Sequence, residues 1–176
     1  MVLTIDLYGC SYDYIEIRGR GMIYTELTIR AMKIAYRAHE GQVDKIGVPY
    51  IYHPVHLAEQ MTTEDTCVAA LLHDVVEDSD CSLDDLKAQG FTDAQIEAVR
   101  LLTHEIKEGL DYKGREQEYL DYVRRLKSNP IARIVKLADL THNMDPNRMK
   151  NPTEWDEKRM KKYKKAYEIL KADDHN

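Results

Sequence analysis

The chain has 176 residues, with 25 basic and 31 acidic side chains and a formal net charge of −6 at pH 7. This length is typical of one domain, which buries roughly 70% of the surface that the unfolded chain exposes. The content of 43% hydrophobic and 32% charged residues excludes wholesale disorder. An acidic balance also argues against nucleic acid as a partner, because backbone binding needs many phosphate-neutralising Lys and Arg.

No segment is apolar for long enough to cross a membrane. The longest uninterrupted apolar run covers residues 67–72, whereas a membrane helix needs about 20 residues. The N-terminus has no continuous apolar region typical of a secretory leader. The three cysteines are odd in number and have no CxxC spacing. We therefore expect a soluble, cytoplasmic protein without a membrane partner.

The first 21 residues differ from the rest of the chain. VLTIDLY and YDYIEI alternate with period two around residues 9–11, which predicts a β-hairpin. A second interpretation is that Met22 is the true start and that residues 18–21 are a translated ribosome-binding segment. Both stay open, so we divide the chain into an N-terminal extension, 1–21, and a domain, 22–176.

From Thr25 onward the pattern predicts one helix after another. Apolar residues recur at helical spacing, and capping residues mark several helix starts. The predicted helices begin near residue 25, at 54, after Thr62 or Thr63, after Ser82 and Thr92, near 119, at 130 and near 153, and residues 105–115 form an exposed loop. The fold class is therefore all-α.

The segment His73-Asp74-Val75-Val76-Glu77-Asp78 is the most informative for chemistry. On a helix His73, Asp74, Glu77 and Asp78 share one broad face. Three carboxylates there repel one another unless a cation lies among them, and imidazole with carboxylate suits a divalent first-row metal. The alternative is a helix end with ordinary solvated acidic residues.

Two further segments are weaker by themselves. Lys136, Asp139 and Asn143 are spaced i, i+3 and i+7, which suits metal ligation beside polar substrate contacts. Alternatively, Lys136 and Asp139 form a surface ion pair that contributes a few tenths of a kcal/mol. His53 immediately precedes a predicted helix, and a single histidine there is more often structural than a ligand.

Together, three motifs resemble a family: AHEGQVDKIGVPYIYHP (38–54), AALLHDVVED (69–78) and VKLADLTHN (135–143). Their order is similar to that in the HD-domain hydrolases of the Rel/Spo group, which degrade the alarmone ppGpp, and above all to the small stand-alone alarmone hydrolases. The resemblance covers about residues 31–148. It implies an all-α HD-domain helical bundle that hydrolyses the 3′-pyrophosphate ester of a small anionic nucleotide, leaving GDP or GTP.

The resemblance also implies the roles of particular residues, carried over by motif. A divalent ion, commonly Mn²⁺, would have four ligands: His53, His73, Asp74 and Asp139. Glu77 and Asp78 would be the catalytic pair that orients and deprotonates the attacking water. Lys45 and Asn143 would contact the substrate. The oligomeric state stays open.

The chain departs from the family pattern at the positions that recognise the base. Asp44-Lys45-Ile46 stands where the family has Arg-Lys-Ser, and Leu140 stands where it usually has Arg or Lys. Asp44 cannot replace a planar cation and should repel a polyphosphate. Phosphoester hydrolysis is thus better supported than ppGpp specificity. The alternatives are another phosphorylated nucleotide as substrate, or a non-catalytic metal or nucleotide sensor.

The predicted C-terminal helix carries a run of basic residues between Lys158 and Lys171. Such a run is usually a solvated face, and we favour that interpretation. The alternative is a cationic rim that attracts phosphates, which salt would screen.

Overall fold

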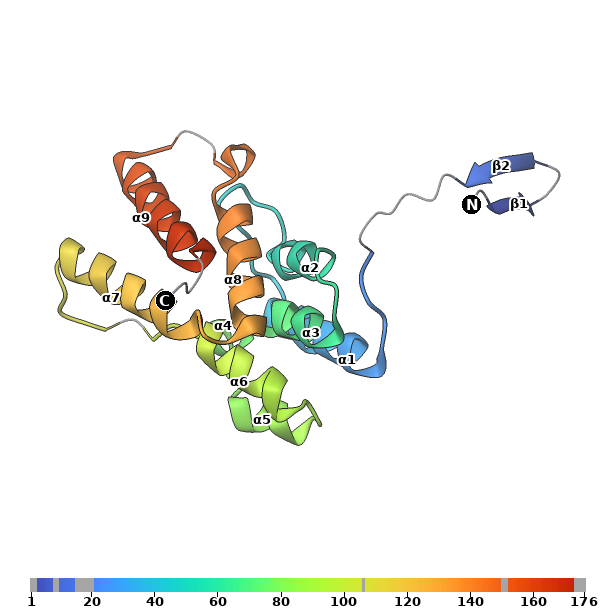
Figure 1. The fold of residues 1–176 in the computed structure, drawn as a ribbon, viewed down its shortest axis with the longest axis horizontal. Coiled ribbons are helices and arrows are strands. Elements are labelled where there is room, and N and C mark those ends of the chain that lie inside the picture. Colours follow the sequence, from blue (N-terminus) through green and yellow to red (C-terminus); the bar gives the residue numbers. More distant parts are fainter. Residues whose placement is uncertain (1–2, 8–9, 15–20, 106, 150–151, 173–176) are drawn as a thin grey trace.

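The computed structural model describes residues 3–7, 10–14, 21–105, 107–149 and 152–172, with side chains from residue 21 onward (Figure 1). These residues form nine α-helices, one 3-10 turn and one hairpin, which confirms the predicted all-α fold. The helices are α1 (Glu26–Ala38), α2 (Tyr52–Ala58), α3 (Glu64–Leu72), α4 (Val75–Asp78), α5 (Leu83–Ala88), α6 (Asp93–Leu102), α7 (Tyr112–Leu126), α8 (Pro130–Asn143) and α9 (Glu154–Lys171), and the turn η1 covers Pro146–Arg148.

The hairpin consists of β1 (Leu3–Leu7) and β2 (Cys10–Tyr14). The strands pair antiparallel, with Leu3 opposite Tyr14 and Leu7 opposite Cys10. Cys10, predicted at the turn, therefore belongs to β2. Residues 18–20 lie outside the described residues, and a native start at Met22 stays a prediction.

Side-chain caps explain where most helices begin. A side-chain oxygen accepts a hydrogen bond from the main-chain N–H three residues further on, and each such cap contributes about 1 kcal/mol. The capping residues are Thr25, Thr63, Ser82, Thr92, Asp111, Asn129 and Thr153. The cap at Asp111 was not predicted, because residues 105–115 carry two glycines and many charges. The structure corrects that prediction: α7 begins at Tyr112, inside the segment expected to be a loop.

The central helix is α3, which packs against α1, α2, α6 and α8. Residues 67–72 are completely buried, as expected for a helix that is apolar all round. Helix α9 packs against both α7 and α8, and in Figure 1 α7 and α9 lie at the left of the bundle, beside the more central α8. The C-terminal end of α3 is thereby held rigidly at the centre of the fold.

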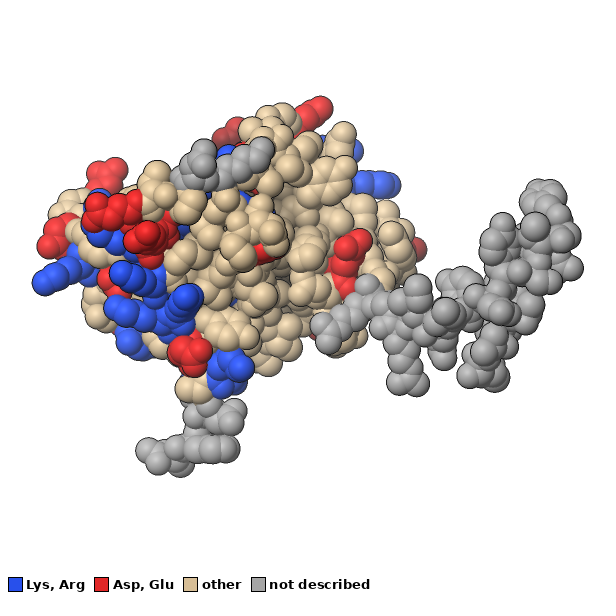
Figure 2. Space-filling view, turned by 90° about the horizontal axis from the view of Figure 1, so that it is seen from above, with Lys and Arg blue, Asp and Glu red and all other residues tan. Residues whose placement is uncertain are grey.

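Basic side chains gather at one end of the molecule. Figure 2 shows many Lys and Arg side chains, with acidic ones among them, at the end where α7 and α9 lie. Among the described residues no helix has both the length and the apolar character needed to cross a membrane.

Candidate active site

Four predicted metal ligands converge at the C-terminal end of α3. His53 comes from α2, His73 and Asp74 follow α3, and Asp139 comes from α8. His53 Nε2 lies 3.3 Å from His73 Nε2, 3.2 Å from Asp139 Oδ1 and 3.7 Å from Asp74 Oδ2. His73 Nε2 lies 3.0 Å from Asp74 Oδ2. We call these four residues the ligand cluster.

A break in the helix brings two adjacent side chains into this cluster. The prediction of one helix through His73 and Asp78 was wrong, because α3 ends at Leu72 and α4 begins at Val75. On a regular helix adjacent side chains point about 100° apart. At the break Asp74 has φ −103° and ψ −6°, and its carboxylate turns toward the imidazole of His73.

The spacing of these atoms fits a divalent metal ion. Metal–nitrogen and metal–oxygen bonds of about 2.0–2.2 Å place neighbouring ligand atoms about 3.0–3.5 Å apart. His53, His73 and Asp139 offer ligand atoms that all lie within 4.8 Å of one another. His73 Nδ1 lies 2.8 Å from the main-chain oxygen of Ala70, which can only accept, so Nδ1 donates. In the neutral ring the Nε2 lone pair is therefore free for a metal.

Electrostatic interactions within the cluster are strong. Desolvation lowers the pKa of His73, but the neighbouring Asp74 carboxylate outweighs it and raises that pKa to about 9. Desolvation also opposes ionisation of Asp139, yet Lys136 and His53 hold its pKa well below the usual value. A bound cation would replace these protons as the partner of the carboxylates, so metal binding releases protons.

Neighbouring side chains hold the carboxylates in place. Tyr50 donates a 2.5 Å hydrogen bond to Asp74 Oδ2. On α8, Lys136 Nζ lies 2.8 Å from Asp139 Oδ2, and the Asn143 amide donates to Asp139 Oδ1 at 2.5 Å. The Lys136–Asp139 pair is nearly buried, with 12% and 6% of the two side chains exposed. It is thus not the weak surface pair that the spacing alone allowed.

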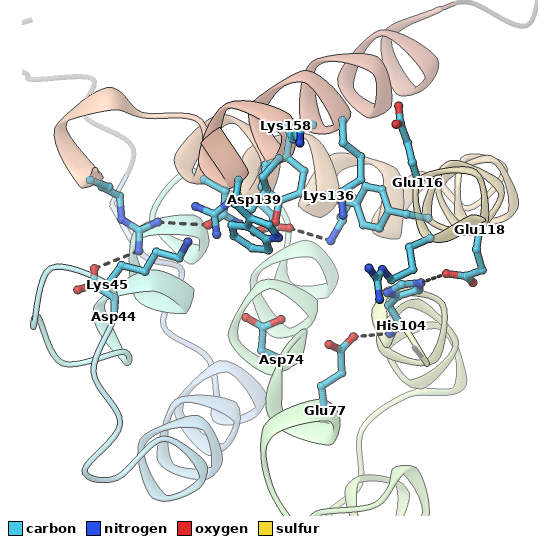
Figure 3. A pocket seen from close by; sticks show the side chains of 18 of the residues that line it. Asp44, Lys45, Asp74, Glu77, His104, Glu116, Glu118, Lys136, Asp139 and Lys158 are labelled. Carbon is cyan, nitrogen blue, oxygen red and sulfur yellow. Dashed lines mark hydrogen bonds and ion pairs between the residues drawn. The ribbon is translucent and has the colours of Figure 1, made fainter. Parts of the chain in front are cut away.

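The ligand cluster adjoins an open pocket of about 810 Å³. Figure 3 shows Asp74 and Glu77 reaching into it from the α3–α4 side, with Lys136 and Asp139 on the other side. Glu77 Oε1 accepts a hydrogen bond from the His104 main-chain N–H. Desolvation raises the pKa of Glu77, and the charge of Asp74 adds to this effect.

Of the other three predicted site residues, two line the pocket and one does not. Asp78 is the last residue of α4 and is not among the described residues that line the pocket, although desolvation and Asp74 raise its pKa. Lys45 and Asn143 both line the pocket. Lys45 Nζ lies 2.9 Å from an Asp156 carboxylate oxygen and 4.7 Å from the Trp155 ring centroid, so its charge is already paired.

The structure shows what surrounds Asp44 and Leu140, two of the positions that depart from the family pattern. Asp44 accepts hydrogen bonds from the main-chain N–H groups of Ile46 and Val48 and pairs with Arg148 at 3.2 Å. Its charge is thus offset, and repulsion of a polyphosphate is weaker than the sequence suggested. Leu140 is completely buried and does not line the pocket.

Basic residues of α9 form the wall opposite Glu77. The pocket lining includes Lys158, Arg159 and Lys162, which we call the basic wall. Lys162 Nζ lies 4.2 Å from the Tyr119 ring centroid. Desolvation and the nearby Lys136 and Arg159 charges lower the pKa of Lys162, so its ammonium would gain from an anionic ligand. These three residues thus fit the interpretation of the C-terminal basic run as a cationic rim that attracts phosphates, rather than as a solvated face.

Several pocket residues were not predicted from the sequence. Tyr50, His104 and Arg148 line the pocket, and His142 contacts the ligand cluster through His53. Tyr50 and His142 lie inside the motifs 38–54 and 135–143, so their positions could have indicated a place near the site. His104 is paired with Glu118, at 2.7 Å, and no local pattern connects these two residues.

A family model of the HD domain matches residues 31–170. The chain belongs to the HD-domain family. MESH1 of Homo sapiens, named a guanosine-3′,5′-bis(diphosphate) 3′-pyrophosphohydrolase, is 38% identical over 144 residues, which cover 77% of each chain. The bifunctional (p)ppGpp synthase/hydrolase SpoT of Escherichia coli is 36% identical over 123 residues, or 65% of this chain and 17% of that protein.

The fold is also similar to that of a solved structure, described as a metazoan ortholog of SpoT that hydrolyzes ppGpp. The two structures have a TM-score of 0.68 and 26% sequence identity, and the match covers 86% of this chain and 89% of the other. Similarity to known proteins therefore extends over most of this chain, both in sequence and in structure.

Proposed function

We propose that this HD-domain protein is a metal-dependent phosphohydrolase, and that its substrate is guanosine-3′,5′-bis(diphosphate), which it converts to GDP and pyrophosphate. The observation that carries the proposal is the ligand cluster at the edge of a pocket with a basic wall. The relatives named for this reaction support the choice of substrate, because MESH1 matches over 77% of both chains.

We assign the metal to the four groups of the ligand cluster, with Mn²⁺ as the first candidate. A divalent ion held there supplies an acidified water and neutralises phosphate charge. An ion that accepts six ligands, such as Mn²⁺, would keep room for water and a substrate oxygen beside these two nitrogen and two oxygen ligands. The spacing of 3.0–3.7 Å between ligand atoms supports this assignment.

Around this centre the residues of the chain have distinct roles. Glu77, with its raised pKa, is poised to take the proton of the attacking water. Asp78, the second member of the predicted pair, does not line the pocket and acts through its charge, which contributes to the raised pKa of Glu77. Lys158, Arg159 and Lys162 bind the phosphates from the basic wall. Lys45 and Asn143 contact the nucleoside end, and Lys45 exchanges its pairing with Asp156 for the substrate.

The direct test is to incubate Mn²⁺-loaded protein with ppGpp and to measure released pyrophosphate and GDP. We expect stoichiometric formation of both products, and loss of turnover after EDTA treatment that Mn²⁺ restores. A Glu77→Gln variant is the control for contaminating hydrolases. Absence of pyrophosphate release from the metal-loaded protein would contradict the proposed substrate.

A second candidate is a different phosphorylated nucleotide. It is favoured by Asp44, which occupies the edge of the pocket with a carboxylate paired to Arg148 instead of a free cation. A panel of nucleotides at equal concentration separates the candidates by kcat/KM. A non-catalytic sensor would bind nucleotide and metal without turnover, and Glu77→Ala would leave its binding unchanged.

A further inference from the structure

A chain of side-chain contacts connects the ligand cluster to the loop between α1 and α2. His53 Nδ1 lies 2.7 Å from His142 Nδ1. His142 Nδ1 lies 3.2 Å from Arg148 Nη1, and Arg148 Nη2 lies 3.2 Å from Asp44 Oδ2. These four residues come from α2, α8, η1 and the loop before α2, so only the fold brings them together.

The direction of each hydrogen bond in this series of contacts follows from the guanidinium of Arg148. A guanidinium group has only donors, so His142 Nδ1 accepts from Arg148 and carries no proton. His53 Nδ1 must then be the donor in the 2.7 Å contact. The two imidazole planes differ by only 11° and their centroids lie 5.0 Å apart, as expected for rings that meet edge to edge, and the single lone pair of His142 Nδ1 is shared between the nearer His53 donor and the more distant Arg148 donor. In the neutral ring of His53, Nε2 is consequently bare.

These side-chain contacts fix the tautomer of His53, as a main-chain carbonyl fixes the tautomer of the other histidine ligand, His73. His73 donates its Nδ1 proton to the carbonyl of Ala70, so its tautomer needs no side-chain partner. Among the described residues, the hydrogen-bond partner of His53 Nδ1 is the His142 ring, which by itself can donate or accept. Arg148 removes that ambiguity.

We propose that His142 and Arg148 are positioning residues that hold His53 with Nδ1 protonated and Nε2 directed at the metal, and that Asp44 anchors Arg148. Asp44 is suited to this role because the Ile46 and Val48 N–H groups fix its carboxylate at 3.0 and 2.9 Å. The departure from the family pattern at position 44 thereby gains a structural purpose. The inference rests on the metal site of the proposed function.

The first test is the dissociation constant of Mn²⁺, measured by the EPR signal of the free ion. Loss of a partner that orients a metal ligand typically weakens affinity by about 10–100-fold, and we expect this for His142→Phe. His142→Asn keeps an acceptor at the same distance from the main chain and should recover most of the affinity. His56→Phe is the matched control, because the His56 ring contacts His142 with a centroid distance of 4.2 Å on the exposed side.

Arg148→Met tests the remote part of the chain. Without the guanidinium, the His142 ring adopts both tautomers, and a binding-competent fraction of one half weakens the apparent affinity about twofold. The hydrogen bond itself has a spectroscopic signature. In the Zn²⁺-loaded, ¹⁵N-histidine-labelled protein, His142 Nδ1 should appear as a bare nitrogen that is coupled to the Nδ1–H of His53.

The inference is overturned if His142 Nδ1 carries a proton, or if folded His142→Phe and His142→Asn both bind Mn²⁺ as tightly as the wild type. Circular dichroism shows whether each variant is folded, and the half-buried Arg148, which lies further from the ligand cluster, provides a readout through Arg148→Met if His142→Phe is not folded. The proposed function fails separately: Mn²⁺ binding with the expected variant affinities, but without turnover, refutes the reaction and supports the positioning roles.

Discussion

The ligand cluster and the basic wall face each other across one pocket, but they are built in opposite ways. Each side chain of the cluster is held by another group: His73 by the Ala70 carbonyl, Asp74 by Tyr50, Asp139 by Lys136, and His53 by His142. Three of the four cluster residues are at least 96% buried. Such a site is rigid before any ligand arrives.

The basic wall is held mainly by contacts with aromatic rings and by one exposed ion pair. Lys158 pairs with Glu154 on the surface, with 47% and 80% of these side chains exposed. Arg159 lies over the rings of Trp155 and Tyr163, and Lys162 over Tyr119. Rigid side chains suit the proposed metal site, whereas long cationic side chains can adapt to a polyphosphate. In the proposed function, the contrast separates catalysis, carried by α2, α3, α4 and α8, from substrate recruitment, carried by α9.

The largest expected effect is on the acidic side of the pocket. Glu77→Gln should lower kcat by about 10²–10⁴-fold, because it removes a general base. The Mn²⁺ dissociation constant should stay unchanged, since Glu77 is not a ligand. Steady-state kinetics and Mn²⁺ titration of the same preparation measure both. The exposed Glu105→Gln serves as the control, and equal kcat in the two variants would remove Glu77 from the mechanism.

The next effect concerns stability. In metal-free protein Lys136→Met should lower the free energy of unfolding by about 3–5 kcal/mol, because it leaves the buried Asp139 charge without its partner. Urea unfolding in EDTA measures this, and Mn²⁺ should restore part of the loss. Lys158→Met, from the exposed pair, should cost at most about 1 kcal/mol. Equal losses would show that burial does not separate the two pairs.

A smaller effect is expected at the basic wall. Lys162→Met should raise KM for ppGpp about tenfold, with little change in kcat, because a charge-assisted contact to phosphate is lost. It should also make kcat/KM less sensitive to salt. The neighbouring Lys161 is exposed and does not line the pocket, so Lys161→Met is the matched control. A wall without a role in binding would give identical KM values.

The smallest effect is a shift along the pH axis. The pKa of Glu77 is raised above the ordinary value of 4.5, and the base works only when ionised. The rate should therefore be lost as pH falls through this raised pKa, and the acidic limb of kcat should lie above pH 4.5. A pH–rate profile at saturating metal measures it. A limb at or below the ordinary value would show that bound substrate and metal remove the desolvation effect.

The sequence predicted the fold better than the details of the site. Apolar spacing and capping residues located α1, α3, α6, α8 and α9, since these signals are local. The start of α7 was missed because a single cap at Asp111 outweighs the glycine and charges that follow. The break at residues 73–74 was missed as well, because no Pro or Gly marks it in the sequence. The break is also slight, since both residues keep backbone angles in the right-handed helical region.

The resemblance in motif order implied a ligand set of two histidines and two carboxylates, because the identity of a chemical group is a property of a single position in the chain. Only the tertiary structure decided which partners those groups meet. Lys136 became a buried counterion, Asp44 an anchor for Arg148, and His142 a neighbour of His53 across 89 residues of chain. The physical reason is that burial and hydrogen-bond direction arise from helices packed side by side, and neither is encoded in the spacing within one helix.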